Sequence, residues 1–226
     1  MNEWELTRAS FLSEDEVASL VSALEQRESD STEGSLAGAA TDRVIIETLL
    51  YSGLRNTEFC RLRVEDTIIG TKASTVRVVG TPNQDRTIYI PESLAALHRR
   101  YVREIRPLVL PPDVSPKDHS QALIFNERGR PYERTALYRR VVRILTDVGL
   151  GARASVQLLR HTYGYLAYLR TGGNLLFVQR QLGHAHSMVT AIYAQFVEHP
   201  YDQLANQVAN HSSPLAARRA SRKDSR

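Results

Sequence analysis

One helical segment places a guanidinium group on a face that is otherwise small or apolar. The segment is QLLRHTYGYLAY, residues 157–168, and the guanidinium belongs to Arg160. Helical spacing aligns Arg160 with Val156, Tyr163, Gly164 and Ala167. Such a stripe faces a protein core, where arginine keeps its proton and needs a negative partner. The sequence therefore predicts that Arg160 meets either a carboxylate of this chain or an anionic ligand.

The remaining pattern predicts a mainly α (α+β) fold with a small antiparallel three-stranded sheet. Ser13 and Glu16 form a capping box that starts a helix ending near Gln26. Further helices are predicted over 42–53, 93–109, 133–150, 155–170, 175–182 and 187–193, with a weak one over 201–213. Glycines end two of these helices, at Gly53 and Gly183, and the caps expected for the last two strong ones are Asn174 and Ser187. The predicted strands are a hairpin over 74–80 and 86–91 and a short strand over 122–126.

Charge is distributed unevenly along the chain. Residues 1–40 hold nine acidic and two basic side chains, whereas the last ten residues hold five basic and one acidic. The net charge of the whole chain is +4, so the middle is basic too. A basic middle and tail indicate a polyanion such as nucleic acid, although a solubilising surface would look similar.

Composition indicates one soluble domain. Of the 226 residues, 42% are hydrophobic and 24% are charged, and no stretch is long and apolar enough to cross a membrane. The chain shows no secretion signal, and its one cysteine, Cys60, fits a reducing cytoplasm. Cys60 lies among helix-forming residues, so we interpret it as a packing residue rather than a nucleophile.

Two further motifs accompany the Arg160 segment. GLRNTEFCRL places Arg55 directly after a predicted turn, and LGHAHSMVTAIY places His184 nine residues before Tyr193. With QLLRHTY between them, these blocks resemble, in order, those of the catalytic domain of tyrosine recombinases, the family of phage integrases and bacterial chromosome-dimer recombinases. The resemblance covers roughly residues 41–200.

The resemblance implies a tyrosine-type DNA strand transferase that works as a site-specific recombinase or integrase. Arg55 and Arg160 would grip the non-bridging oxygens of a DNA phosphate, which suits bidentate guanidinium groups. His184 would contact the same phosphate, and Tyr193 would attack it to form a 3′-phosphotyrosyl intermediate. Glu58 would orient Arg55, and His161 would support the site. The ester conserves bond energy, so no cofactor, ATP or metal is expected.

Two positions depart from the family pattern. Gln157 stands where the family usually has histidine, and Thr81 stands where a hairpin lysine protonates the departing 5′-oxygen. Neither side chain shuttles a proton at neutral pH. Lys72 and Arg86 are the nearest basic residues and the candidates for this task, and Arg86 matches an arginine that in the family usually contacts a DNA phosphate. The second hypothesis is therefore a recombinase-like DNA-binding module with weak or lost catalysis.

Three segments follow from these motifs: an acidic N-terminal helix and mobile connector over 1–40, the catalytic domain over 41–200, and a C-terminal helix with a partly disordered basic tail over 201–226. Most of the family carries a larger N-terminal helical domain, so the chain is expected to be a fragment, a minimal enzyme or a relic. The partners expected are double-stranded DNA, at the nucleoid, and further copies of the chain bound through the C-terminal segment. A membrane partner is not expected.

Simpler interpretations stay open at the sequence level. Both arginines could be salt-bridged inside the protein, Tyr193 could be a core residue, and His184 could merely cap a helix. A zinc site from His161, His184 and His186 is disfavoured, because no cysteine or carboxylate spacing supports it.

Overall fold

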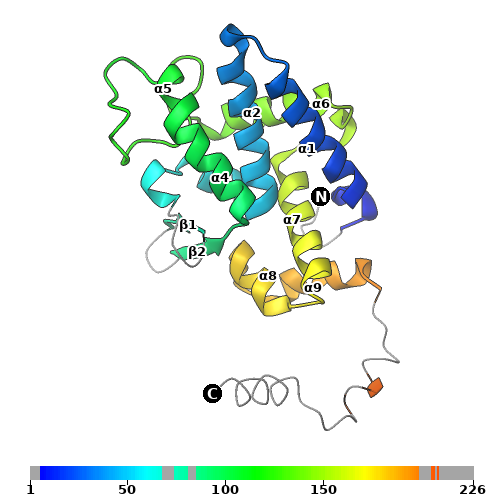
Figure 1. The fold of residues 1–226 in the computed structure, drawn as a ribbon. Coiled ribbons are helices and arrows are strands. Elements are labelled where there is room, and N and C mark those ends of the chain that lie inside the picture. Colours follow the sequence, from blue (N-terminus) through cyan, green and yellow to red (C-terminus); the bar gives the residue numbers. More distant parts are fainter. Residues whose placement is uncertain (1–5, 68–73, 81–84, 199–204, 207, 209–226) are drawn as a thin grey trace, which may run out of the picture. The chain divides into compact units, whose positions relative to one another are not determined.

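The computed structural model describes residues 6–67, 74–80, 85–198, 205, 206 and 208 (Figure 1). Met1–Phe196 forms one compact unit and Val197–Arg226 a second. Within the described residues the fold is mainly helical, as predicted. None of the described helices has the length and apolar character needed to span a membrane.

The helices and strands follow in this order: α1 (Glu14–Ser29), α2 (Glu33–Ser52), α3 (Asn56–Cys60), β1 (Thr75–Val78), β2 (Arg86–Tyr89), α4 (Glu92–Arg100), α5 (Arg106–Val109), α6 (Arg134–Asp147), α7 (Val156–Arg170), α8 (Leu175–Leu182) and α9 (Ser187–Ala191). Short 3₁₀ turns cover Arg8–Ser10, Val64–Asp66, Gly151–Arg153 and Ile192–Phe196. A π-helical segment, Tyr101–Ile105, joins α4 to α5.

The first two helices pack side by side (Figure 1). The predicted capping box starts α1: Ser13 N–H donates to Glu16 Oε2 over 2.8 Å, and Glu16 N–H donates to Ser13 Oγ over 3.1 Å. Charge also links the pair, because Arg43 of α2 binds Glu25 of α1 at 2.6 Å.

The prediction of a mobile connector within residues 1–40 was wrong. Residues 33–40 form the first two turns of α2, so the predicted boundary at residue 40 falls inside this helix. Leu36 and Ala37 pack against the core, and that contact stabilises a stretch whose small residues and two glycines suggested a loop. Tertiary packing, rather than local propensity, decides such cases.

Helix α2 is the centre of the core. Its large buried apolar side chains are Val44, Ile45, Ile46, Leu49 and Leu50, each at most 1% exposed. It contacts α1, α4, α6 and α7, and it ends at Gly53, which adopts the left-handed conformation. Cys60 of α3 is half-buried against this core, and burial raises the pKa of its thiol to about 11.

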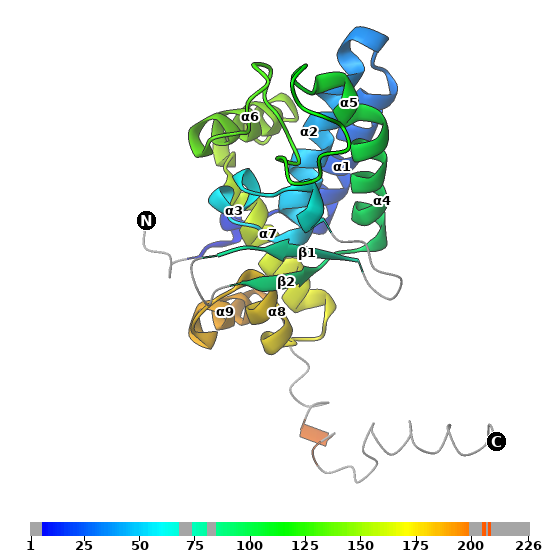
Figure 2. The ribbon, with the colours of Figure 1, turned by 90° about the vertical axis from the view of Figure 1, so that its left-hand side faces the viewer.

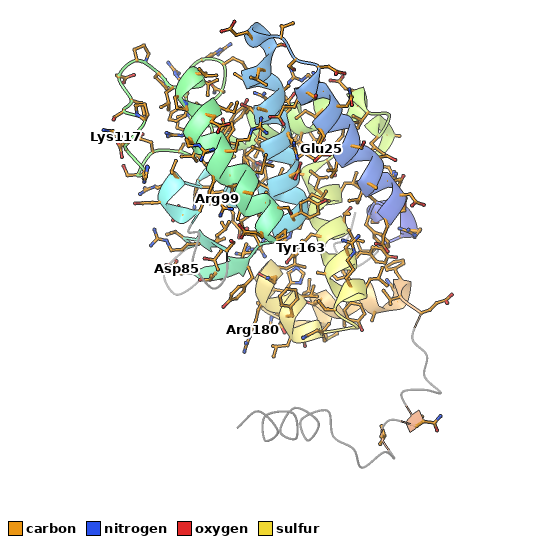
Figure 3. The ribbon with its side chains drawn as sticks, viewed as in Figure 1. Glu25, Asp85, Arg99, Lys117, Tyr163 and Arg180 are labelled. Atoms are coloured by element: carbon orange, nitrogen blue, oxygen red, sulfur yellow. The ribbon has the colours of Figure 1, made fainter. Side chains whose placement is uncertain are left out.

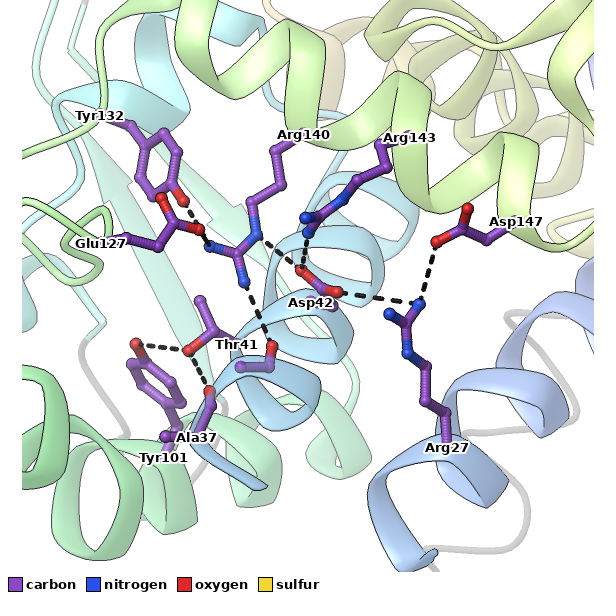
Figure 4. Close-up of polar contacts among 11 residues, drawn as sticks. Arg27, Ala37, Thr41, Asp42, Tyr101, Glu127, Tyr132, Arg140, Arg143 and Asp147 are labelled. Atoms are coloured by element: carbon purple, nitrogen blue, oxygen red, sulfur yellow. Dashed lines mark hydrogen bonds and ion pairs between the residues drawn. The ribbon is translucent and has the colours of Figure 1, made fainter. Parts of the chain in front are cut away.

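A buried ion pair joins α2 to α6 (Figure 4). Asp42, only 2% exposed, accepts from Arg140 Nε at 2.6 Å, and Arg140 also donates to Glu127, Tyr132 and the Gly38 carbonyl. Removing one member of such a pair leaves a buried charge and costs about 3–5 kcal/mol. The pair therefore fixes α6, which forms one wall of the cavity described below.

The sheet has two strands among the described residues, not the three predicted. β1 and β2 pair antiparallel, with Val76 opposite Ile88. The segment predicted as a third strand, 122–126, makes only isolated bridges, from Ala122 to Arg63 and from Phe125 to Pro131. Two separate partners at its two ends prevent a continuous ladder.

The hairpin is clamped to α8 by one buried glutamine. Gln181, 2% exposed, accepts from Tyr89 N–H at 3.0 Å and donates to the Tyr89 carbonyl at 3.1 Å. Figure 2 shows the hairpin beside α8, and Figure 3 shows the exposed Arg180 pointing away from the fold. The clamp places β2 next to the end of α8, where the candidate site begins.

Candidate active site

The three sequence blocks converge on one cavity of about 670 Å³. Its lining comes from the start of α3, one face of α6, the first turns of α7 and the segment from His184 to Tyr193. The lining residues are Arg55, Asn56, Thr57, Arg134, Thr135, Tyr138, Ser155, Val156, Gln157, Arg160, His161, His184, Ala185, His186, Val189, Ile192 and Tyr193. Six of the ten predicted site residues are among them: Arg55, Gln157, Arg160, His161, His184 and Tyr193. Glu58 and Arg86 lie behind the cavity wall, while Lys72 and Thr81 lie outside the described residues.

Arg160 is buried, with 5% of its surface exposed, and its partners are main-chain carbonyls. Its terminal nitrogens donate to the carbonyl of Gly53 and, over 2.7 Å, to that of Leu182. These carbonyls belong to the C-terminal ends of α2 and α8, which carry partial negative charge. Burial and the charge of Arg55 lower the pKa of Arg160 to about 10, so it stays protonated at neutral pH. No carboxylate pairs with it among the described residues, so of the two predicted partners, a carboxylate of this chain or an anionic ligand, the first is not found there.

Arg55 begins α3 and is held by Glu58 of the same helix. Glu58 accepts from the Arg55 N–H at 2.7 Å and from Arg55 Nη1 at 2.9 Å, and Arg55 Nη2 donates to the Gly183 carbonyl at 3.2 Å. The Arg55 side chain is still 45% exposed, so part of its guanidinium group is open to a ligand in the cavity.

Arg86 takes a different place from the predicted phosphate contact. Its two terminal nitrogens donate to both oxygens of Glu58, at 2.7 and 2.9 Å, and its Nε donates to the Gln181 carbonyl at 3.2 Å. Burial would raise the pKa of Glu58, but hydrogen bonds from Arg86 and from the Arg55 N–H outweigh it and bring the pKa to about 2. Arg86 thus neutralises the carboxylate that orients Arg55.

Three consecutive carbonyls at the end of α8 accept hydrogen bonds from the three arginines. Gln181 binds Arg86, Leu182 binds Arg160, and Gly183 binds Arg55. Gly183 has φ 65° and lies so close to Arg86 that an added Cβ would come within 2.9 Å of the guanidinium carbon. Only glycine adopts this positive φ easily and leaves room for the guanidinium group of Arg86. These two requirements explain the glycine of the LGH block.

His184 and Tyr193 also line the cavity, and His184 directly follows Gly183. His184 Nδ1 lies 2.8 Å from Thr190 Oγ1, which leaves Nε2 as the ring nitrogen available to a ligand. Burial, aided by Arg160 and Arg55, lowers the pKa of His184 to about 4. The histidine is therefore neutral at pH 7 and can act as a hydrogen-bond partner rather than a cation.

Tyr193 is 1% exposed, and its hydroxyl lies 3.1 Å from His161 Nδ1. Burial raises the pKa of the phenol to about 12, against the opposite effect of Arg160. The prediction that Ser187 caps the last helix was wrong: Ser187 is the first residue of α9, and His186 occupies the N-cap position without a side-chain capping hydrogen bond. The helix ends at Ala191, and Tyr193 lies on the following 3₁₀ turn. This tighter turn carries Tyr193 into the cavity. The described residues contain no group of three or more His, Cys, Asp or Glu side chains placed to hold a metal ion.

Sequence reasoning missed the wall formed by α6. Arg134 and Tyr138 line the cavity from that helix, four residues apart and hence on one face. The signal was present, since the helix read as basic, but nothing in its spacing showed which face met the site. Asn56, which follows Arg55, ties the two walls by donating to the Arg134 carbonyl at 3.1 Å.

Comparison with known proteins points to the same family as the three sequence motifs. Residues 10–199 match the phage integrase family. The tyrosine recombinase XerD of Staphylococcus epidermidis is 29% identical over 155 residues, which are 67% of this chain and 49% of that protein. The chain therefore spans about half the length of the curated relatives it matches.

Solved structures share the fold. The XerH site-specific recombinase bound to palindromic difH substrate, in a post-cleavage complex, gives a TM-score of 0.69 at 21% identity over 90% of this chain and 54% of that chain. The catalytic domain of bacteriophage HP1 integrase gives a TM-score of 0.51 at 20% identity, over 90% of this chain and 98% of the domain. The match over residues 10–199 confirms the resemblance found in the sequence: the chain belongs to the phage integrase family.

Proposed function

We propose that this chain is the catalytic part of a site-specific DNA recombinase or integrase that cuts and rejoins DNA through Tyr193. The observation that carries the proposal is that Arg55, Arg160, His184 and Tyr193 line one cavity. They come from three separate blocks of the sequence. A core packing role for the tyrosine or internal salt bridges for both arginines would not require this convergence.

The charge of the site suits a phosphate diester. Among the residues that the structure describes, the guanidinium groups of Arg55, Arg86 and Arg160 surround one carboxylate, that of Glu58. The arginines that line the cavity therefore retain positive charge toward it. Preorganised donors of this kind stabilise the oxygens of a phosphoryl transition state. That XerH, with the same fold, was solved bound to its difH substrate supports DNA as the source of the phosphate.

The reaction would run through two exchanges at phosphorus. The Tyr193 oxygen forms a bond to phosphorus as the bond to the 5′-oxygen breaks, and the departing oxygen takes up a proton. The resulting 3′-phosphotyrosyl ester is then attacked by a 5′-hydroxyl, which releases Tyr193 and rejoins a strand. Arg86 is bound to Glu58, so we assign the proton donation to another group, with Lys72 as the candidate from this chain.

The test is a covalent adduct. The chain is incubated with a nicked suicide DNA substrate that loses its 5′-hydroxyl fragment after cleavage, and the products are resolved on a denaturing gel. We expect an adduct that disappears in Tyr193→Phe and persists in Tyr165→Phe, a matched control on α7 whose ring stacks on Phe11 outside the cavity. DNA binding without any adduct would instead indicate the binding module with lost catalysis, and no DNA binding would refute both.

Assembly is a further part of the proposal. Recombination joins two DNA duplexes, so we propose that copies of the chain associate on DNA, at the nucleoid in the cytoplasm, through the segment 201–226. Sedimentation of the chain with DNA, with and without this segment, tests the association. An unchanged complex size after its removal would contradict the assignment.

A further inference from the structure

Two successive hydrogen bonds connect Gln157 to the candidate nucleophile. Gln157 Nε2 lies 3.1 Å from His161 Nε2, and His161 Nδ1 lies 3.1 Å from the Tyr193 hydroxyl. Gln157 and His161 are one turn apart on α7. Gln157 is exposed at the cavity, whereas the phenol at the other end of the chain of bonds is buried.

The direction of these bonds follows from what each atom can do. An amide nitrogen only donates, so His161 Nε2 must be the unprotonated, accepting nitrogen. A neutral imidazole carries one proton, which is then on Nδ1 and points at the Tyr193 oxygen. His161 is neutral at pH 7, because burial and the neighbouring Arg160 lower its pKa to about 4.

We propose that Gln157 is a positioning residue that fixes the Nδ1–H tautomer of His161, so that His161 donates a hydrogen bond to the oxygen of Tyr193. The catalytic meaning of this contact rests on the proposed function of Tyr193; the tautomer itself does not. In this arrangement His161 stabilises negative charge as it develops on the attacking oxygen. The phenolic proton leaves on the cavity side, to water or to a non-bridging oxygen of the bound phosphate.

Gln157 therefore has a role that does not require it to carry a proton. The family usually has a histidine at this position. Here the glutamine amide is turned along the helix to His161 instead, and a residue that cannot carry a proton still decides where the proton of its neighbour lies.

The tautomer can be measured without DNA. In ¹⁵N-histidine-labelled protein, nitrogen chemical shifts distinguish protonated from unprotonated ring nitrogens, and the His161 signals are identified by their loss in His161→Asn. We expect Nδ1 protonated and Nε2 unprotonated in the wild type. Gln157→Glu puts an acceptor at this place and should move a proton onto Nε2, whereas Gln157→Lys, which only donates, should leave Nε2 unprotonated.

A matched control adds the same charge elsewhere. Gln195→Glu changes an exposed residue two positions after Tyr193 that does not line the cavity, and it should leave the His161 tautomer unchanged. A protonated Nε2 in the wild type, or an unprotonated Nε2 in Gln157→Glu, would overturn the proposal. Because Gln157 is exposed, circular dichroism should show the fold intact in both variants.

The suicide substrate then connects the tautomer to the chemistry. Loss of one hydrogen bond to a developing charge lowers a rate by about tenfold, so Gln157→Glu should form the adduct about tenfold more slowly than Gln195→Glu. Equal rates, with the tautomer switched, would show that the donated bond has no catalytic role. A wild type with the expected tautomer and no adduct would refute the proposed function and leave the tautomer assignment standing.

Discussion

Gly164 allows Tyr193 to occupy its place, and Gly164→Ala tests this directly. A Cβ atom built on Gly164 would lie 2.5 Å from the Tyr193 hydroxyl oxygen and 2.6 Å from Cε2 of the same ring. Ordinary contacts between such atoms begin about 1 Å further out. The added methyl group therefore cannot coexist with the phenol in its present position, and the ring must move.

Two opposing terms set the effect on stability. Alanine in a helix interior is favoured over glycine by about 1 kcal/mol, while overpacking a tight site costs about 1–3 kcal/mol. The free energy of unfolding should thus change little or fall by up to about 2 kcal/mol. The effect on chemistry should be larger, because displacement of a reacting group by about 1 Å costs on the order of 100-fold in rate.

The assay compares adduct formation with urea denaturation of the same variants. Gly38→Ala is the matched control, since the same methyl group added to α2 meets no atom within 4 Å. We expect Gly38→Ala to raise the free energy of unfolding and keep the adduct, and Gly164→Ala to remain folded but lose about 100-fold in adduct rate. A Gly164→Ala protein that forms the adduct at the wild-type rate would show that Tyr193 does not react from this position.

Two further predictions concern stability. Arg86→Ala removes both hydrogen bonds of Arg86 to Glu58, so the pKa of Glu58 should rise from about 2 and the free energy of unfolding at pH 7 should fall by about 2–3 kcal/mol. The control is Arg63→Ala at an exposed ion pair, which should cost under 1 kcal/mol. Equal losses for the two variants in urea denaturation would contradict this expectation. Burial lowers the pKa of His98 from 6.5 to about 4, so the unfolded chain takes up its proton first. His98 should therefore contribute a fall in stability of about 3 kcal/mol between pH 6.5 and pH 4, and urea titrations of His98→Gln should show a loss smaller by that amount than the wild type, which also carries the losses from His161 and His184.

Much of the fold was predictable because its signals are local. The caps at Ser13 and Asn174 and the stops at Gly53 and Gly183 depend on side chains within a few residues, and the structure confirms each. The segment 33–40 was not predictable in the same way. Its helix depends on contacts with the core that composition does not reveal.

The sequence predicted part of the cavity lining but not the contacts that hold it. Six of the predicted site residues line the cavity, whereas Arg134 and Tyr138 of α6 were not predicted. The partners of Arg160 are carbonyls of Gly53 and Leu182, and a main-chain carbonyl leaves no trace in a sequence. The pairing of Arg86 with Glu58 spans 28 positions and depends on how β2 lies against α8.

The last turn of α8 and the glycine that follows it hold three arginine side chains in place through their carbonyl groups. Three neighbouring peptide units, those of residues 181–183, each hold one guanidinium group, so the positions of the cations depend on one short stretch of backbone. Gln181 also fastens β2 to this turn. A displacement of α8 would therefore weaken the anchoring of Arg55, Arg86 and Arg160 at the same time.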